Sequence, residues 1–214
     1  MRSVSEVLEQ LLSPVPVIPV LTLNEVDSAL PLAETLVEAG LHVLEVTLRT
    51  PNALEVIRRM RELGDSVTVG AGTVLSERDL DSAAEAGAGF AVAPGATPAL
   101  YRAASEADLP LLPGVATASE IMTGLEFGFN RFKFFPAEPA GGVAALGAFS
   151  GPFANVRFCP TGGIHADNAL AYARLGNVMT VGGSWMAPAG AIEDHAWERI
   201  AALARDCVNL LGSP

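Results

Sequence analysis

The sequence predicts an α/β fold, more specifically a (β/α)8 TIM barrel with an extra N-terminal helix. From residue 17 onward, short runs rich in β-branched and apolar residues alternate with longer, alanine-rich segments of helical period. The alternation repeats about eight times within 214 residues, which fits the lower end of the size range of such barrels. A doubly wound open sheet is the structural alternative, but the Gly-rich turn that usually follows its first strand is missing here.

The strands are expected where the apolar runs occur. In chain order these runs are VIPVLT, HVLEVT, VTVG, FAVA, LLP, RFKF, VRFCP and VMTV, at residues 17–22, 42–47, 67–70, 90–93, 111–113, 131–134, 156–160 and 178–181. Most of them are rich in Val, Leu or Phe, which favour buried strands. In a barrel all strands point the same way, so the residues that follow each strand should gather at one end.

The helices are expected between the strands, and several carry start or stop signals. Their ranges are 25–39, 52–63, 77–85, 98–107, 118–126, 142–149, 166–174 and a last stretch through 194–210. Ser76 directly precedes the third helix and is a typical N-cap residue. Glycines lie just past four helix ends, at Gly40, Gly64, Gly87 and Gly128. Pro31 falls inside the first helix and, because proline lacks a backbone N–H, should kink it or delay its start.

Residues 1–214 should form a single barrel domain, with residues 1–14 as a leading helix. No Ser/Gly linker, charge block or low-complexity tract divides the chain. No apolar run approaches the ~20 residues of a membrane-spanning helix, so no membrane association is expected. Residues 1–12 are amphipathic and lack the long apolar core of a secretory signal, which predicts a cytoplasmic location.

Charge and cysteine content narrow the partners further. The chain has 13 basic and 24 acidic residues, and this net charge of −11 repels a phosphate backbone. No basic stripe interrupts the acidic character, so we expect no nucleic-acid partner. Cys159 and Cys207 show neither CxxC nor Cys/His spacing, and we expect both to be reduced, with no zinc site.

Lys133 is the only lysine in the chain, and it stands in an aromatic stretch, NRFKFFP, at residues 130–136. An ammonium removed from water is expensive unless it is paired, so burial among aromatic neighbours should disfavour the charged form. The neutral amine that results can attack a carbonyl carbon. The alternative is a lysine whose stem packs on apolar surface while its ammonium reaches water, which is the commoner arrangement.

Residues 44–49 (LEVTLR) alternate apolar and polar side chains, so Glu45, Thr47 and Arg49 should share one face of a strand. In a closed barrel this polar face points inward. Glu45 is then a candidate general acid or base, and the Arg49 guanidinium suits a substrate carboxylate. An ordinary half-solvated strand would show the same alternation.

Three glycine turns are expected after strands. Residues 70–73 (GAGT) offer small side chains that let a ligand approach the backbone, and the Thr73 hydroxyl is a possible donor. The other two turns follow the last two strands, where barrels often bind phosphate through backbone amides. Their candidate phosphate-binding residues are Gly162 and Gly163 in PTGGI (160–164), and Gly183 and Ser184 in GGS (182–184). Tight turns that need positive φ are the alternative interpretation.

Other strand-end residues complete the candidate pocket. Phe135 and Pro94 are placed to wall it, although plain packing is the commoner role of each. His165 and His195 fall in predicted surface helices and His42 at a strand start, so none of the three is placed as a base or ligand. No His/Asp/Glu cluster follows the strands, and we expect neither a metal nor a cofactor.

Five segments of the chain resemble the bacterial 2-keto-3-deoxy-6-phosphogluconate (KDPG) aldolase family, whose members are also described as 4-hydroxy-2-oxoglutarate (KHG) aldolases. The segments are LEVTLRT (44–50), VGAGTV (69–74), RFKFFPAE (131–138), FCPTGGI (158–164) and GGSW (182–185). The resemblance runs from about residue 15 to residue 188, nearly the whole chain. It is most specific in the segments around Lys133 and Thr161.

This resemblance implies a (β/α)8 barrel that assembles as a homotrimer. It also implies that Lys133 forms a Schiff base with the substrate and that Glu45 shuttles protons. The remaining implied roles are pyruvate carboxylate binding by Arg49 and Thr73, phosphate binding by Gly162, Gly163 and Ser184, and an influence of Thr161 on stereochemical choice.

The reaction implied is class I (Schiff-base) cleavage of KDPG, a 2-keto acid sugar phosphate, to pyruvate and glyceraldehyde 3-phosphate, as in the Entner–Doudoroff pathway. KHG and 2-keto-3-deoxy-6-phosphogalactonate are alternative substrates, since they differ only in the distal group or in a hydroxyl configuration. A cofactor-free phosphosugar isomerase or epimerase would share the glycine turns but has no need of a lone lysine. A sugar-phosphate binder without activity would leave Glu45 and Lys133 unexplained.

Overall fold

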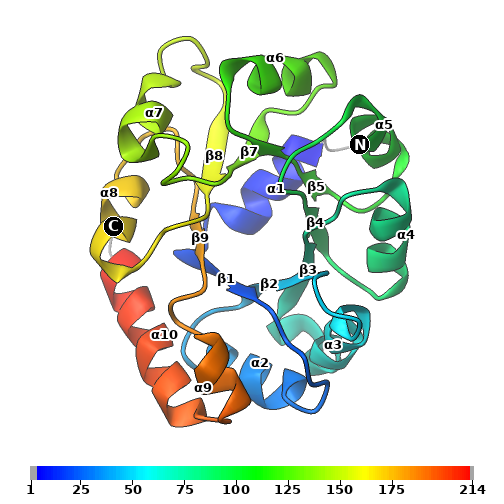
Figure 1. The fold of residues 1–214 in the computed structure, drawn as a ribbon, viewed down its shortest axis with the longest axis vertical. Coiled ribbons are helices and arrows are strands. Elements are labelled where there is room, and N and C mark those ends of the chain that lie inside the picture. Colours follow the sequence, from blue (N-terminus) through cyan, green and yellow to red (C-terminus); the bar gives the residue numbers. More distant parts are fainter. Residues whose placement is uncertain (1–3, 213–214) are drawn as a thin grey trace.

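The structure is a computed structural model that describes residues 4–212, in which strands and helices alternate along the chain (Figure 1). The strands are β1 (Val17–Leu21), β2 (Val43–Thr47), β3 (Thr68–Gly72), β4 (Phe90–Val92), β5 (Leu111–Leu112), β6 (Gly114–Val115), β7 (Arg131–Phe134), β8 (Arg157–Pro160) and β9 (Val181–Gly183). The helices are α1 (Val4–Leu12), α2 (Ala29–Glu38), α3 (Ala53–Met60), the 3₁₀ helix η1 (Arg61–Ser66), α4 (Glu77–Glu85), α5 (Pro98–Glu106), α6 (Ala118–Glu126), α7 (Gly142–Ala148), α8 (Ala166–Ala173), α9 (Ala189–Glu193) and α10 (Trp197–Leu211).

The strands form two parallel sheets, which confirms the predicted α/β class. One sheet has the order β5-β4-β3-β2-β1-β9 and the other the order β6-β7-β8. Only Pro113 separates β5 from β6, and single bridges join Phe158 to Val178 and Thr161 to Gly182. Because every strand pair is parallel, the carboxyl ends of neighbouring strands lie at the same edge. The loops that follow the strands therefore meet there.

Most predicted elements occur at or near their predicted bounds. Helices α4 and α6 span the predicted residues, and the Ser76 hydroxyl accepts the expected N-cap hydrogen bond from the Asp79 amide. Helix α2 begins at Ala29, so Pro31 lies in its first turn, where a missing N–H removes no helical hydrogen bond. The leading helix, predicted for residues 1–14, is α1, and residues 1–3 of that prediction lie outside the described part.

Three elements differ from the prediction. The fifth strand is interrupted at Pro113, which has no N–H to donate, and becomes β5 and β6. The last helix, expected at residues 194–210, begins only at Trp197 as α10, and the short helix α9 before it was not predicted. His195, with a left-handed φ of 51°, lies between the two helices and not within one. The eighth strand, expected at residues 178–181, is β9 and begins only at Val181. It continues through the two glycines that follow, because they also pair with β1.

The hydrophobic core has a larger and a smaller part. The larger part fills the space between the strands and helices α2 to α10, which lie around them in Figure 1. The smaller part contains Phe90 of β4 and Met179, which lies just before β9, together with Leu8 and Leu12 of α1. Helix α1 lies across the middle of the fold in Figure 1, and its two fully buried leucines cover this inner core.

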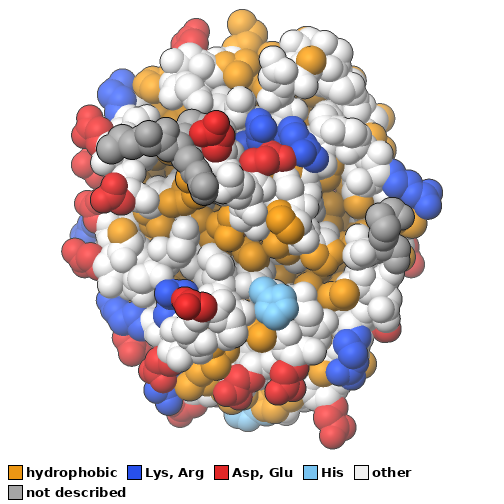
Figure 2. All heavy atoms as spheres, turned by 180° about the vertical axis from the view of Figure 1, so that it is seen from behind, with side chains coloured by type: hydrophobic (Ala, Val, Ile, Leu, Met, Phe, Trp, Pro, Cys, Tyr) orange, Lys and Arg blue, Asp and Glu red, His pale blue; other side chains and the backbone are white. Residues whose placement is uncertain are grey.

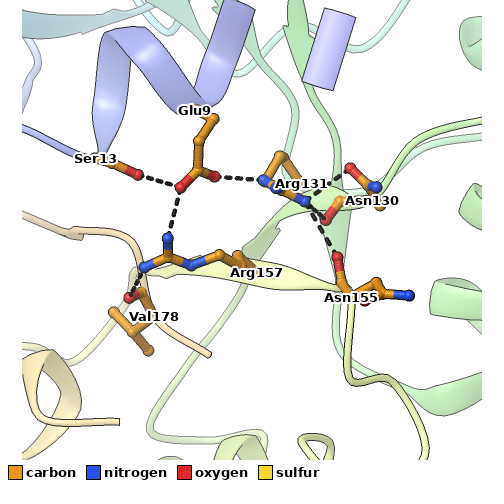
Figure 3. Close-up of polar contacts among 7 residues, drawn as sticks. All are labelled: Glu9, Ser13, Asn130, Arg131, Asn155, Arg157 and Val178. Atoms are coloured by element: carbon orange, nitrogen blue, oxygen red, sulfur yellow. Dashed lines mark hydrogen bonds and ion pairs between the residues drawn. The ribbon is translucent and has the colours of Figure 1, made fainter. Parts of the chain in front are cut away.

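Glu9 connects α1 to two strands (Figure 3). Its carboxylate accepts hydrogen bonds from Ser13, from Arg131 at the start of β7 and from Arg157 at the start of β8, each arginine at 2.5 Å. Burial alone raises the pKa of Glu9, but the bond from Ser13 and the two arginines outweigh burial and hold the pKa below its ordinary value. The charged carboxylate therefore stabilises α1 at the amino ends of β7 and β8.

The surface offers few large apolar side chains. Those exposed among the described residues are Val7, Leu75, Met122, Leu125 and Leu210. The face shown in Figure 2 has apolar side chains near its centre, and most of its charged side chains lie toward the rim. Within residues 4–212, no helix is both long enough and apolar enough to span a bilayer.

We predict that Glu9→Gln lowers the free energy of unfolding at neutral pH by about 1–3 kcal/mol, because it weakens charge-assisted hydrogen bonds to two arginines. A carboxyl group whose pKa is lowered by folding stabilises the fold above its unfolded-state pKa, and this contribution is lost as pH falls through the folded-state pKa. The difference in the free energy of unfolding between wild type and variant should therefore become smaller as the pH falls. Urea unfolding at about pH 7 and about pH 3.5 measures this difference.

The matched control is Glu85→Gln, which removes the same charge from an exposed position on α4. This control should leave the unfolding midpoint within the usual small range of surface substitutions. A gap between wild type and Glu9→Gln that is equally large at both pH values would contradict the role assigned to the carboxylate.

Candidate active site

Lys133 and Glu45 meet between the two sheets. Lys133 is the third residue of β7 and Glu45 the third residue of β2, and these strands belong to different sheets. Their exposed fractions are 5% and 3%, and Lys133 Nζ lies 3.1 Å from Glu45 Oε1. The lysine is therefore buried, as its aromatic surroundings predict. Its ammonium is paired with a carboxylate, the arrangement that makes burial of two charges tolerable.

Glycines in β3 make room for the groups around this pair. A Cβ on Gly72 would lie 2.2 Å from Glu45 Oε1, so the carboxylate occupies the space beside this glycine. A Cβ on Gly70 would lie 2.3 Å from the ring of Phe90. The expectation that these glycines follow the strand and admit a ligand is therefore wrong, because both belong to β3 and other side chains fill the space. Gly72 instead allows Glu45 to face Lys133.

Cys159 and Phe135 form part of the surroundings of the amine. Cys159 pairs with Lys133 in the β7–β8 register, and its thiol lies 4.0 Å from the Thr161 hydroxyl. Burial raises the pKa of Cys159 to about 12, and the Lys133 charge opposes this only in part, so the thiol is neutral at physiological pH. The half-buried ring of Phe135 has its centroid 5.4 Å from Lys133 Nζ. Glu45 is thus the charged partner of the amine.

Arg49 and Thr73 form a second pair, at the carboxyl ends of β2 and β3. Arg49 Nε donates a hydrogen bond to Thr73 Oγ1 at 3.3 Å. The predicted alternation ends at Thr47, the last residue of β2, whose buried hydroxyl donates to the Leu21 carbonyl. Arg49 lies beyond the strand and is exposed, so its position is set by the turn and not by the strand face. Its terminal nitrogens make no hydrogen bond within residues 4–212 and are available to an anion.

The turns after β8 and β9 lie side by side. A bridge joins Thr161 to Gly182, and the Thr161 hydroxyl lies 2.4 Å from where a Cβ on Gly182 would be. Gly162 and Gly163 have φ values of 102° and 78°, so this turn does require glycine. The amides of Gly162, Gly163 and Ser184 donate no hydrogen bond within the described chain. Unpaired amides grouped in this way can bind an anion.

Two further predicted site residues, Gly183 and Pro94, lie in different surroundings. Gly183 pairs with Pro19 of β1 and therefore belongs to β9, not to the turn after it. A Cβ on Gly183 would lie 2.0 Å from the ring of Trp185. Pro94, half-buried after β4, has its carbonyl group 2.2 Å from where a Cβ on Gly114 would be. No group of three or more His, Cys, Asp or Glu that could hold a metal ion occurs among residues 4–212, and His165 caps α8 from outside the helix.

Sequence reasoning did not identify Glu138 and Tyr172 as related to the site. Tyr172 is fully buried on α8, and its hydroxyl donates a hydrogen bond to Glu138 in the loop after β7. The only signal in the sequence is that Glu138 ends the RFKFFPAE segment that contains Lys133. A loop carboxylate and a helix tyrosine 34 residues apart have no periodic relation that would predict the contact.

A buried lysine is paired with a carboxylate, and a turn with unpaired amides follows a neighbouring parallel strand. This combination is typical of a class, the α/β enzymes that activate carbonyl substrates through an amine. Comparison with known proteins makes the assignment more specific. A family model described as KDPG and KHG aldolase matches residues 8–203. The chain belongs to this family, and it is a carbon–carbon lyase.

Individual relatives cover nearly the whole chain. The 2-dehydro-3-deoxy-phosphogluconate aldolase of Dickeya dadantii is 49% identical over 200 residues, which are 94% of each chain. The KHG/KDPG aldolase of Escherichia coli K12 is 48% identical over 200 residues, again 94% of each chain. Among solved structures, one is a crystal structure of KDPG aldolase from Legionella pneumophila with pyruvate captured as a covalent carbinolamine intermediate. Its sequence is 46% identical and the TM-score is 0.90. The match covers 95% of this chain and 97% of that one.

We predict that Gly72→Ala lowers aldolase turnover by about tenfold or more, because the new methyl group would lie 2.2 Å from Glu45 Oε1 and must displace the carboxylate from Lys133. Steady-state kinetics and a crystal structure of the variant measure the two effects. The matched control is Gly95→Ala, since a Cβ at Gly95 meets no atom within 4 Å. Normal turnover of Gly72→Ala, with the Lys133–Glu45 contact intact, would show that the glycine does not position the pair.

Proposed function

We propose that this protein is a class I aldolase that cleaves KDPG to pyruvate and glyceraldehyde 3-phosphate, a reaction of the Entner–Doudoroff pathway. The observation that carries the proposal is the buried contact of 3.1 Å between Lys133 and Glu45. The names of the relatives in the same family support the choice of substrate. Lys133 forms the Schiff base, and Glu45 transfers the protons.

We further propose that the two sheets form one closed (β/α)8 barrel and a single domain. β5 and β6 then count as one strand, and the bridges from Phe158 and Thr161 close the ring between β8 and β9. In this arrangement β2 and β7 stand across the interior from each other, which accounts for the direct contact between their side chains. A homotrimer and a cytoplasmic location remain predictions.

The reaction begins with a proton transfer within the pair. A proton that moves from Lys133 Nζ to Glu45 Oε1 leaves a neutral amine and a carboxylic acid, without exchange with bulk water. The amine attacks the C2 carbonyl carbon and forms a carbinolamine. Glu45 protonates the hydroxyl that departs as water, and a protonated imine results. The imine accepts electrons from the adjacent C3–C4 bond.

In the bond-cleavage step the same carboxylate accepts a proton instead of donating one. Glu45, directly or through one water, removes the proton of the C4 hydroxyl. The C3–C4 bond then breaks, C4 becomes the aldehyde carbon of glyceraldehyde 3-phosphate, and the electron pair forms an enamine on Lys133. Glu45 returns the proton to C3, and hydrolysis of the imine releases pyruvate and the free lysine. The geometry favours a single residue for all of these proton transfers, because Glu45 contacts the lysine nitrogen that carries the intermediate.

Residues at the carboxyl ends of the strands hold the two ends of the substrate. Arg49, backed by its hydrogen bond to Thr73, binds the pyruvate carboxylate through its terminal nitrogens. The amides of Gly162 and Gly163, with Ser184, bind the phosphate. A substrate held at both ends keeps its C3–C4 bond aligned with the imine, a contribution that can reach ~7–11 kcal/mol in the best-oriented systems.

The remaining candidates line the space between these ends. Thr161 lies between Cys159 and the phosphate turn, where its hydroxyl can distinguish the configuration of a substrate hydroxyl. Phe135 faces the amine and Pro94 lies after β4, and both wall the pocket. KHG is the second candidate substrate, since the Escherichia coli relative is named for both compounds.

We predict that borohydride reduction in the presence of pyruvate adds the reduced pyruvate adduct to the peptide that contains Lys133, the only lysine in the chain. Lys133→Arg should abolish both labelling and turnover, since a guanidinium keeps its proton. Mass spectrometry of the digested protein measures the first, and a lactate dehydrogenase assay for pyruvate released from KDPG measures the second. Protein reduced without pyruvate is the control.

Two results would overturn the imine mechanism. One is labelling confined to peptides without Lys133, and the other is near-normal turnover by Lys133→Arg. Absence of pyruvate release from KDPG by the wild-type protein would instead favour the isomerase, epimerase or non-catalytic binder that the glycine turns alone also allow.

A further inference from the structure

The loop after β7 holds the glycine turn after β8 along its length. The Ala137 amide donates to the Thr161 carbonyl at 2.8 Å, and the Glu138 amide donates to the Gly162 carbonyl at 3.0 Å. The next residue, Gly163, lies against the Glu138 side chain, whose Cβ and Cγ are 2.7 and 2.8 Å from where a Cβ on Gly163 would be. The absence of a side chain at Gly163 therefore lets Glu138 pack over the turn.

Glu138 is fixed in turn by Tyr172 of α8. The buried phenol donates a hydrogen bond to Glu138 Oε1. Burial raises the pKa of Tyr172, and the hydrogen bond to Glu138 and its charge raise the pKa further, so the phenol remains a proton donor. Gly142 lies beside the contact, since a Cβ there would be at van der Waals distance from both the phenol oxygen and Glu138 Oε1, and its φ of 63° favours glycine. One hydrogen bond thus links the β7 loop to α8.

The carbonyl groups of the turn are engaged on the protein side. The Gly162 carbonyl accepts from Glu138, and the Gly163 carbonyl accepts from Asn168 Nδ2 at 3.1 Å. Asn168 is itself held, because its Oδ1 accepts from the His165 amide at 2.8 Å. The amides of the same two glycines have no partner within the described chain. The contacts around the turn therefore fix its carbonyls and leave its N–H groups for an anion.

We propose that the Glu138–Tyr172 hydrogen bond holds this turn in its phosphate-binding shape, and that it sets how strongly the enzyme prefers phosphorylated to unphosphorylated substrates. The inference rests on the proposed function, in which the turn binds the substrate phosphate. Glu138 and Tyr172 are positioning residues, since they act through Gly162 and Gly163. The Lys133 contacts are separate from theirs, so loss of the bond weakens phosphate binding and leaves imine chemistry intact.

Tyr172→Phe keeps the buried ring and removes only the hydroxyl. The KM for KDPG should rise about three- to tenfold, as expected when part of the contribution of one charge-assisted hydrogen bond is lost. The kcat, and the KM for KHG, which has no phosphate, should stay near wild type. Glu138→Ala should have the same effect. Glu138→Gln should restore a near-normal KM, because its amide oxygen still accepts from Tyr172.

Two reference variants make the result decisive. Tyr101→Phe removes the hydroxyl of the other tyrosine, which is buried on α5, and should change neither KM. Ser184→Ala reports on the phosphate site itself and should raise the KM for KDPG more than that for KHG. If Ser184→Ala does so and Tyr172→Phe does not, the positioning role is overturned while the phosphate site stands.

Other outcomes also overturn the inference. If neither Ser184→Ala nor Tyr172→Phe changes the KM for KDPG, the phosphate site is wrong and the positioning role falls with it. An equal rise for KDPG and KHG in Tyr172→Phe would indicate a general loosening of the fold. Failure of Glu138→Gln to restore what Glu138→Ala loses would exclude the hydrogen bond as the cause.

Discussion

The hydrogen-bonded ion pair of Lys133 and Glu45 is the interaction on which the rest of the structure depends. An amine and a carboxylate with exposed fractions of 5% and 3% can be buried together only because each compensates the charge of the other, and removing one partner would leave a charge at a cost of about 3–5 kcal/mol. The partners come from different sheets, so the pair joins the two sheets directly. Gly72 provides the space for the carboxylate, and the buried, neutral Cys159 adds no second charge.

Strand β7 serves stability at one end and chemistry at the other. Arg131, its first residue, binds the Glu9 carboxylate that holds α1 over the inner core, and Lys133 follows two residues later. Beyond the strand, the amides of Ala137 and Glu138 hold the glycine turn after β8. The segment from 131 to 138 therefore links the leading helix, the amine proposed to react and the proposed phosphate site. This accounts for its prominence in the resemblance to aldolases.

Periodicity and composition predicted the parallel α/β class, most helix bounds and the burial of Lys133, since these depend on local pattern. These local patterns gave wrong predictions where contacts between distant parts of the chain determine the structure. The sequence predicted space for a ligand beside Gly72, but the Glu45 side chain occupies that space. It also predicted a turn at Gly183, which lies in a strand with the Trp185 ring packed on it. The contact between Glu138 and Tyr172 joins a loop to a helix 34 residues away, and no local pattern encodes it.

Exchange of the methyl protons of pyruvate with D2O, followed by proton NMR, tests most directly the claim that the amine and the carboxylate act as one proton-transfer unit. We predict rapid exchange with the wild-type protein and none with Lys133→Arg. Glu45→Gln should exchange at least about a hundredfold more slowly, because the carboxylate that transfers the protons is absent. Exchange by Glu45→Gln at the wild-type rate would contradict the account.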